Sequence, residues 1–130
     1  MTDPSKRIIL DTNFLVAPFQ LSVSIFEELD HLYPTADIYT LESVIQEAKS
    51  IEDGKYKKLV EKLLEKEDIE ILEDSHNRDV DDALVEASVN YIIATNDKEL
   101  KNRLLDRGRE VVIIRSENYL EVVNRDSVGF

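Results

Sequence analysis

Short apolar runs alternate along this chain with longer segments whose apolar residues recur at helical spacing. The short runs are rich in β-branched residues and too short for helices, which predicts strands over residues 7–10, 37–40, 69–72, 91–94 and 111–114. Between them, apolar positions three and four residues apart predict helices over 21–32, 41–51, 56–66 and 80–87, and one around Leu100 and Leu104. Pro34 and Gly54 end two of these helices, and Asp74–Arg78 is predicted to be a polar loop.

Strands that alternate with helices predict crossover connections and a parallel sheet. The expected fold is therefore α/β, a three-layer α/β/α sandwich around a central, mostly parallel, five-stranded sheet. With 130 residues and no linker or low-complexity segment, the chain is expected to form a single domain over 1–130. The segment from Ser116 onward, with Tyr119, Leu120, Val122 and Val123, is expected to pack back as one more short element.

Composition narrows the possible settings. There is no cysteine, which excludes disulfides and thiolate metal sites and favours an intracellular location. No signal-peptide core occurs in Met1–Arg7, and no apolar run approaches the length of about 20 residues that a membrane-spanning helix needs. We therefore expect a cytoplasmic protein without membrane association.

The net charge of −12 argues against a protein that coats nucleic acid in general, because phosphate binding depends mainly on Lys and Arg. The segment from Asp97 to Arg115 differs, since it carries six basic and four acidic residues. A solvated helix face of mixed charge explains this segment when it is taken alone. The alternative is a basic surface beside an acidic site, where a polyanion would need it.

Two predicted strands run directly into polar clusters. Ile8–Leu10 enters Asp11-Thr12-Asn13, and Ile92–Ala94 enters Thr95-Asn96-Asp97. In open α/β sheets, functional groups gather beyond the carboxyl ends of the strands, so Asp11 and Asp97 are predicted to share a pocket. Several carboxylates in one pocket indicate a divalent cation, because hard cations prefer oxygen ligands. For each residue alone, a helix N-cap is an equally good explanation. Asp11 is the stronger candidate of the two, because Thr12 and Asn13 add a hydroxyl and an amide that can orient it.

Three other carboxylates are candidates by position. Glu47 lies at the margin of the apolar stripe of its helix, so it can face a boundary pocket, although a salt bridge would also explain it. Asp81 and Asp82 open the helix over 80–87, where acidic residues also favour the helix dipole. Asp81 lies closer to the buried face. His31 and His76 have no partner pattern, so a histidine site is not expected.

Taken together, four segments resemble the PIN-domain family of metal-dependent ribonucleases. They are IILDTNFLV, VIQEAKS, DDALVEAS and IIATNDKEL, and they occur in the family's order and spacing across almost the whole chain. None of the four is specific by itself, but their combination is. The opening DTNFLV and the ending TNDKEL look closer to the archaeal and eukaryotic rRNA-processing branch than to the VapC-type toxins.

The resemblance implies an acidic quartet of Asp11, Glu47, Asp81 and Asp97 that binds Mg²⁺ or Mn²⁺ and hydrolyses phosphodiester bonds in single-stranded RNA. Asn13 and Thr95 match supporting polar residues, and Asp82 stays an alternative to Asp81. Lys98, Lys101 and Arg103 are candidates to hold the RNA backbone, because four carboxylates would otherwise repel it.

Alternatives to this function remain at the level of sequence. A response-regulator domain also has a parallel sheet and an acidic pocket, but here no paired acids follow the first strand and no lysine ends the fifth. A Rossmann domain would need a glycine-rich phosphate loop, which three glycines do not provide. A catalytically inactive PIN scaffold that binds RNA or protein is the main non-enzymatic alternative. Structured RNA, an antitoxin, a ribosome-assembly partner or a second copy of the chain are possible partners, and the sequence does not choose among them.

Overall fold

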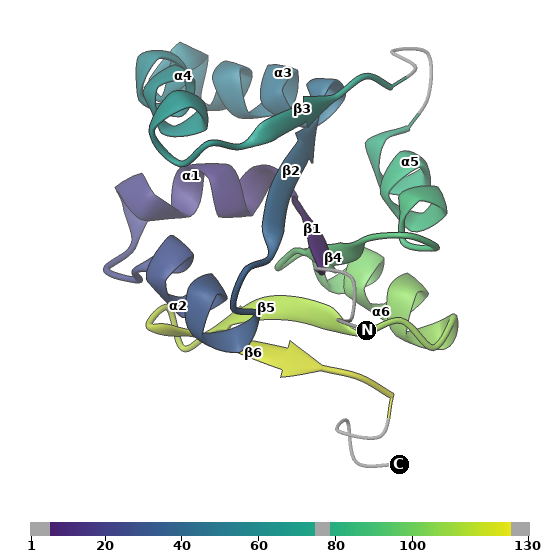
Figure 1. Cartoon of the computed structure of the whole chain (residues 1–130). Helices are drawn as coiled ribbons and strands as arrows, with labels where there is room; N and C mark the ends of the chain where they lie inside the picture. Colours follow the sequence, from purple (N-terminus) through teal and green to yellow (C-terminus); the bar gives the residue numbers. More distant parts are fainter. Residues whose placement is uncertain (1–5, 75–78, 126–130) are drawn as a thin grey trace.

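A twisted sheet runs through the centre of this computed structural model, which describes residues 6–74 and 79–125 (Figure 1). Within these residues the sheet has six strands in the order β3-β2-β1-β4-β5-β6. Neighbouring strands from β3 to β5 are parallel, and β6 is antiparallel to β5. The strands are β1 (Arg7–Leu10), β2 (Asp37–Leu41), β3 (Glu70–Leu72), β4 (Ile92–Ala94), β5 (Val111–Arg115) and β6 (Tyr119–Val123).

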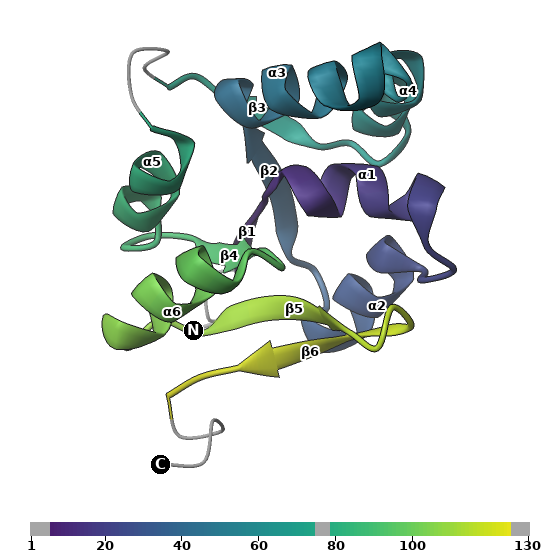
Figure 2. The ribbon, with the colours of Figure 1, turned by 180° about the vertical axis from the view of Figure 1, so that it is seen from behind.

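Helices cover both faces of this sheet, which gives the three layers that the alternation of strands and helices predicts. Helices α1 to α4 lie on one face, and α5 and α6 lie side by side on the other (Figures 1 and 2). The helices are α1 (Thr12–Gln20), α2 (Ile25–Leu32), α3 (Glu42–Ser50), α4 (Lys57–Lys66), α5 (Val80–Ala87) and α6 (Lys98–Asp106), with a 3₁₀ turn η1 (Ile51–Gly54) before α4. The predicted α/β fold is confirmed.

The central strands are apolar on both faces because helices cover both. Ile8, Ile9 and Leu10 of β1 are fully buried, as are Val111 and Val112 of β5. Continuous apolar runs of this kind are typical of parallel strands between two helical layers. None of the helices in the described part of the chain is long and apolar enough to cross a membrane.

The chain changes direction across the sheet at β1. The connections after β1 and β2 build the sheet toward β3, and the chain then returns so that β4 pairs with the other side of β1, with Leu10 beside Ala94. Ligand sites in open α/β folds form at such a switch point, beyond the carboxyl ends of the strands. The polar clusters that follow β1 and β4 are therefore neighbours in space.

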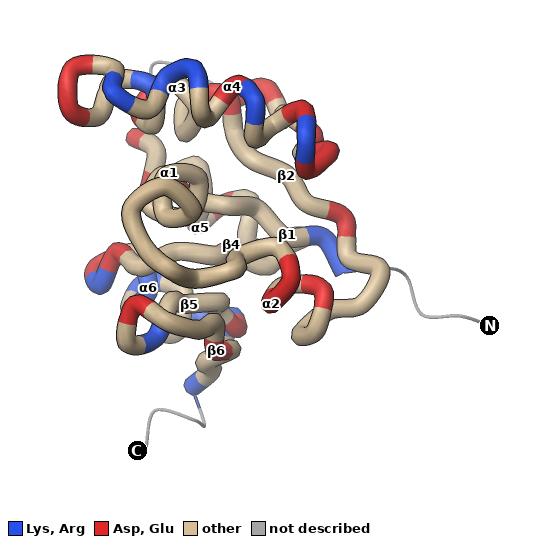
Figure 3. The backbone as a smooth tube through the Cα atoms, turned by 90° about the vertical axis from the view of Figure 1, so that its left-hand side faces the viewer, with Lys and Arg blue, Asp and Glu red and all other residues tan. Residues whose placement is uncertain are grey.

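The helix predicted over 21–32 begins later than expected, and a helix that was not predicted precedes it. The structure has α1 over Thr12–Gln20 and α2 from Ile25, and Leu21 is the residue that ends α1. No charged residue occurs in α1, which passes between α3 and the sheet (Figure 3), and five of its nine residues are buried. A helix with so little polar surface has no amphipathic period to reveal it, and Pro18 further obscures the pattern.

The predicted count of five strands is corrected to six by β6, which forms a hairpin with β5. The chain reverses at Ser116 and Glu117, both in the left-handed region with φ of 54° and 55°. Tight hairpin turns usually contain Asn-Gly or Asp-Gly in their sequence, and this turn contains neither. The other strand predictions hold to within one residue at each end. Most of the predicted loop over 74–78, with His76, lies outside the described residues.

Candidate active site

Asp11 is the most deeply buried of the predicted site carboxylates. It follows β1 directly, caps the amino end of α1 and is only 5% exposed. Its carboxylate accepts hydrogen bonds from the backbone N–H of Thr12 at 2.7 Å and from the hydroxyl of Thr95 at 2.6 Å. Burial raises the pKa of Asp11 despite these bonds, and the negative charges of Glu47 and Asp97 raise it further.

Thr95 connects Asp11 to Asp97. The Thr95 hydroxyl donates to Asp11 and accepts a hydrogen bond from the backbone N–H of Asp97 at 3.1 Å. Asp97 in turn caps α6, since its carboxylate accepts from the N–H of Leu100 at 2.8 Å. Asp97 therefore has the capping role that its position allows, and its exposed charge still acts on Asp11 and Asp81.

Glu47 enters the site from the opposite side, on the helix α3. Its carboxylate accepts a hydrogen bond from the hydroxyl of Thr12 at 3.0 Å. Thr12 therefore uses both of its donors on site carboxylates, its N–H on Asp11 and its hydroxyl on Glu47. The expectation that the Thr12 hydroxyl orients Asp11 is therefore wrong, because this hydroxyl donates its hydrogen bond to Glu47.

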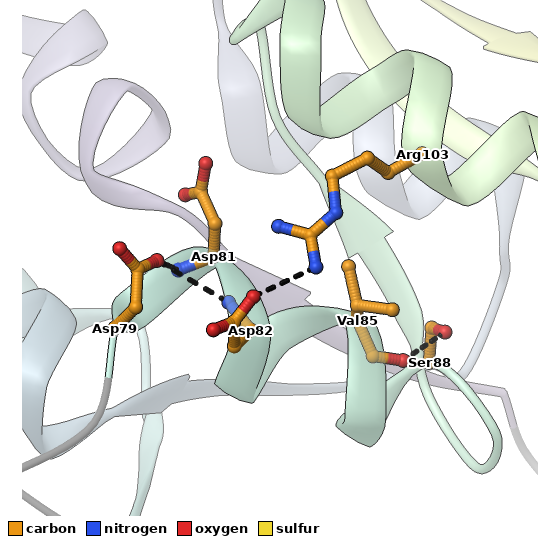
Figure 4. Close-up of polar contacts among 6 residues, drawn as sticks. All are labelled: Asp79, Asp81, Asp82, Val85, Ser88 and Arg103. Atoms are coloured by element: carbon orange, nitrogen blue, oxygen red, sulfur yellow. Dashed lines mark hydrogen bonds and ion pairs between the residues drawn. The ribbon is translucent and has the colours of Figure 1, made fainter.

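Asp81 and Asp82 are adjacent in sequence but face different groups (Figure 4). Asp79 caps α5 through the N–H groups of both residues. The Asp81 carboxylate points away from Arg103, and burial together with the charges of Asp97 and Asp11 raises its pKa to about 6. Asp82 instead forms an ion pair with Arg103, at 2.7 Å. The shared electrostatics thus favour Asp81 over Asp82 as the member of the acidic group.

The two strand-end loops are also joined by asparagines. The side chain of Asn13 accepts a hydrogen bond from the backbone N–H of Asn96 at 3.0 Å. The side chain of Asn96 bonds both backbone groups of Ile114 on β5, accepting at 2.6 Å and donating at 3.3 Å. Asn13 was expected to orient Asp11, and its contact shows that it fixes the neighbouring loop instead. Asn96 was missed, although its place between two selected residues was a usable signal.

The three predicted RNA-binding cations do not form one group. Lys98 is exposed in the first turn of α6, next to Asp97, and Lys101 is half-buried one turn later. Arg103 is engaged with Asp82, whose hydrogen bond raises the pKa of the guanidinium. Lys98 and Lys101 therefore stay the candidates for phosphate contact at the rim, while Arg103 has a partner within the chain.

The donor set fits a hard divalent cation in chemistry, because every candidate ligand is a carboxylate, a hydroxyl or an amide oxygen. Burial raises the pKa of Asp11 and Asp81, and the neighbouring carboxylates raise both further, a repulsion that a cation would relieve. Within residues 6–74 and 79–125, however, no three His, Asp or Glu side chains are grouped closely enough to hold one ion. Binding would therefore need water-bridged ligands or side-chain movement.

Comparison with known proteins identifies relatives of this arrangement. A model of the family described as "PIN like domain" matches residues 8–117. Ribonuclease VapC4 of Methanocaldococcus jannaschii is 30% identical over 125 residues, which cover 89% of this chain and 95% of that protein. The solved structure of the PIN domain endonuclease Utp24 is similar with a TM-score of 0.77 and 26% identity, covering 92% of each chain. The resemblance stated from the four sequence motifs is thus confirmed. The chain belongs to the PIN-like domain family.

Proposed function

We propose that this protein is a divalent-metal-dependent endoribonuclease that hydrolyses phosphodiester bonds in single-stranded RNA. The observation that carries the proposal is the convergence of carboxylates from separate segments: the Thr95 hydroxyl joins Asp11 to the backbone of Asp97, and Thr12 donates to both Asp11 and Glu47. The charges of Asp97 and Asp11 also act on Asp81. Two nucleases among the relatives, a ribonuclease and an endonuclease, support the same reaction class.

In this proposal Asp11 is the central ligand of Mg²⁺ or Mn²⁺, and Asp81 and Asp97 bind the ion directly or through water. Thr95 and the N–H of Thr12 hold the Asp11 carboxylate in place, which limits the reorganisation that ion binding requires. A bound ion of this kind would neutralise the carboxylates and the scissile phosphate and make a nearby water molecule more acidic.

Glu47 is proposed to orient and deprotonate the attacking water. It is exposed, and the hydrogen bond from Thr12 fixes its position relative to Asp11. The water oxygen attacks phosphorus, the bond from phosphorus to the 3′ oxygen breaks, and that oxygen takes a proton. The products are a 5′-phosphate and a 3′-hydroxyl. Lys98 and Lys101 are proposed to contact phosphates flanking the scissile bond, where they would offset the acidic group.

Cleavage by Asp11→Asn tests the proposal. Wild type and variant are incubated with end-labelled unstructured RNA in Mg²⁺, in Mn²⁺ and in EDTA. We expect metal-dependent internal cleavage by wild type and a loss of about a hundredfold or more in the variant, in the range typical for groups that stabilise a developing charge. Asp106→Asn, an exposed carboxylate at the end of α6, is the matched control and should cut normally. A folded Asp11→Asn protein that cuts at the wild-type rate would disprove the assignment.

A catalytically inactive scaffold is the second candidate. The absence of a preassembled group of three ligands among the described residues favours it. In that case RNA or protein binding would persist without cleavage in any divalent ion. The biological setting is a further proposal: an antitoxin or a ribosome-assembly factor is the partner that the family resemblance implies, and self-association stays a prediction.

A further inference from the structure

Two adjoining hollows lie on the α5–α6 side of the molecule, and four arginines line them: Arg7, Arg103, Arg107 and Arg109. One, of about 420 Å³, lies at the amino ends of β1 and β4 and is lined by Lys6, Arg7, Tyr91 and Arg109, among others. The other, of about 330 Å³, lies between α5 and α6 and is lined by Asp82, Val85, Arg103 and Arg107, among others. Both include Val89 and Arg109, so they are continuous.

The second hollow is built from one face of each helix. Asp82, Val85, Glu86 and Val89 follow one another at helical spacing along α5 and its end, and Arg103 and Arg107 lie one turn apart on α6. The seven steps from Asp82 to Val89 span about 10 Å along α5 and the turn that follows it. The end at Asp82 adjoins the acidic group through Asp81, as Figure 4 shows for the residues at that end. The two hollows therefore run from the acidic site, beyond the carboxyl ends of the strands, to the amino ends of β1 and β4.

Two arginines of the first hollow are held by partners that do not neutralise them. The guanidinium of Arg7 lies 4.4 Å from the ring centroid of Tyr91 and donates to the Tyr91 hydroxyl and the Asn90 carbonyl. Arg109 donates to the hydroxyl of Ser88 at 3.3 Å. An arginine that is oriented by neutral groups keeps its charge available for an anion and loses little side-chain entropy on binding it.

Acidic residues in the same hollows are fewer. The two hollows are lined by five basic residues, Lys6, Arg7, Arg103, Arg107 and Arg109, and by three acidic ones, Asp82, Glu86 and Glu110. Asp82 is paired with Arg103, and Glu110 accepts a hydrogen bond from the Tyr33 hydroxyl. In a chain with a net charge of −12, a continuous surface with a basic excess is a local reversal of sign.

We propose that this surface, which we call the basic tract (Lys6, Arg7, Arg103, Arg107 and Arg109), binds the RNA strand on one side of the cleavage site. The inference rests on the proposed ribonuclease function and adds the path of the substrate. Phosphates of the strand contact Lys6, Arg107 and Arg109, and the exposed guanidinium of Arg7 offers a planar surface for a base. Val89, which is 66% exposed where the two hollows meet, adds apolar contact.

The test is RNA affinity in EDTA, measured by fluorescence anisotropy across a salt series, so that cleavage does not enter. The probes are a labelled oligouridine long enough to span the molecule and a labelled trinucleotide. The tract variant is Lys6→Gln, Arg107→Gln, Arg109→Gln. The control variant is Lys57→Gln, Lys58→Gln, Lys62→Gln, which removes the same charge from exposed positions on α4, on the opposite face of the sheet.

We expect the tract variant to bind the long RNA about tenfold more weakly and to lose about 2 from the slope of log affinity against log salt, because each phosphate contact to a single strand contributes about 0.7. The control variant should change neither value, and the trinucleotide should be affected less than the long RNA. A double variant, Lys6→Gln with Arg107→Gln, keeps the contacts of Arg7 and Arg109 and should lose about 1.4 from the slope. If the triple variant melts at a lower temperature than wild type, the double variant serves as the test of the basic tract.

Unchanged affinity and slope for the long RNA would overturn the basic tract, and so would an equal loss in the α4 control or an equal loss on the trinucleotide. These outcomes are separate from the proposed function. A wild-type protein that cuts RNA while the tract variant binds normally would retain the ribonuclease and reject the tract. If the wild-type protein never cuts RNA, but its binding of long RNA depends on the tract, the basic tract is retained and the ribonuclease function is rejected.

Discussion

The hydroxyl of Thr95 donates a 2.6 Å hydrogen bond to the carboxylate of Asp11, joining positions that are 84 residues apart in the chain. The same oxygen accepts from the N–H of Asp97. Both threonine and aspartate are buried, so no water competes for this bond. The position of the central carboxylate is therefore set by the strand that lies next to it, β4, as well as by its own segment.

Replacing Thr95 by Val should destabilise the protein most when Asp11 is charged. The substitution removes a hydrogen bond to a buried carboxylate, which costs about 1–3 kcal/mol, and it also removes the acceptor for the Asp97 N–H. Chemical denaturation should show a larger loss at high pH than at low pH, because burial raises the pKa of Asp11 and a protonated Asp11 depends less on the bond. Thr95→Ser keeps the hydroxyl and should behave as wild type. Equal losses at both pH values would show that the effect is packing alone.

The metal-free protein should lose stability as the pH rises from about 4 to about 6. The pKa of Asp81 is raised from 3.8 to about 6, so within this window the folded chain holds a proton that the unfolded chain has released. Folding is then opposed as the pH increases, and below the window both states are protonated. Thermal melting in EDTA across this range measures the effect, and Asp81→Asn should flatten the profile.

Arg103→Gln should strengthen that pH dependence. Arg103 lowers the pKa of Asp81 while Asp97, Asp11 and Asp79 raise it, so removing the guanidinium shifts the Asp81 pKa further upward. The same melting series measures the change. If Arg103→Gln leaves the profile unaltered, the charge on Arg103 acts on Asp82 alone.

Added Mg²⁺ or Mn²⁺ should raise the melting temperature through Asp81 and not through Asp82. Binding to the folded state alone stabilises it by about 2.7 kcal/mol at a hundred times the dissociation constant. Asp81→Asn should reduce this gain, and Asp82→Asn, which removes the partner of Arg103, should leave it in place. The opposite pattern would assign the metal ligand to Asp82 and reject the electrostatic argument for Asp81.

Charge reversal at Lys98 and Lys101 should weaken RNA binding in the presence of metal. Both follow Asp97 on α6, and losing two phosphate contacts should lower the salt slope by about 1.4. Lys57→Glu with Lys58→Glu on α4 changes the net charge equally and serves as the control. An identical response in the two variants would mean that the rim lysines act only through net charge.

Residues next to strand ends were the part of the site most accessible to sequence analysis. Asp11 and Asp97 could be selected because a parallel sheet brings the carboxyl ends of its strands to one edge. Asp81 could be preferred to Asp82 from helical geometry, since one residue changes the facing direction by about 100°. Glu47 was a candidate from its place at the margin of the apolar stripe of its helix, and the resemblance to the PIN family assigned it to the quartet.

Contacts between segments were not accessible in the same way. The pairing of Arg103 with Asp82 depends on the packing of α5 against α6, which no local pattern encodes. The roles of Thr12 and Asn13 were assigned to the wrong partners because a hydroxyl or amide can reach several groups near its own backbone. The helix α1 was missed because burial on most of its surface leaves no amphipathic signal.

The pairing of β4 with β1 also determines when the acidic group can assemble during synthesis of the chain. Asp11 directly follows the first strand, but Thr95 and Asp97 are made some 80 residues later, after the residues of α1 to α5. No amino-terminal fragment that ends before β4 contains the acidic group, however well its helices form. In the proposed function, the chain therefore emerges among cellular RNA without its cleavage site, and acquires that site only when β4 pairs with β1.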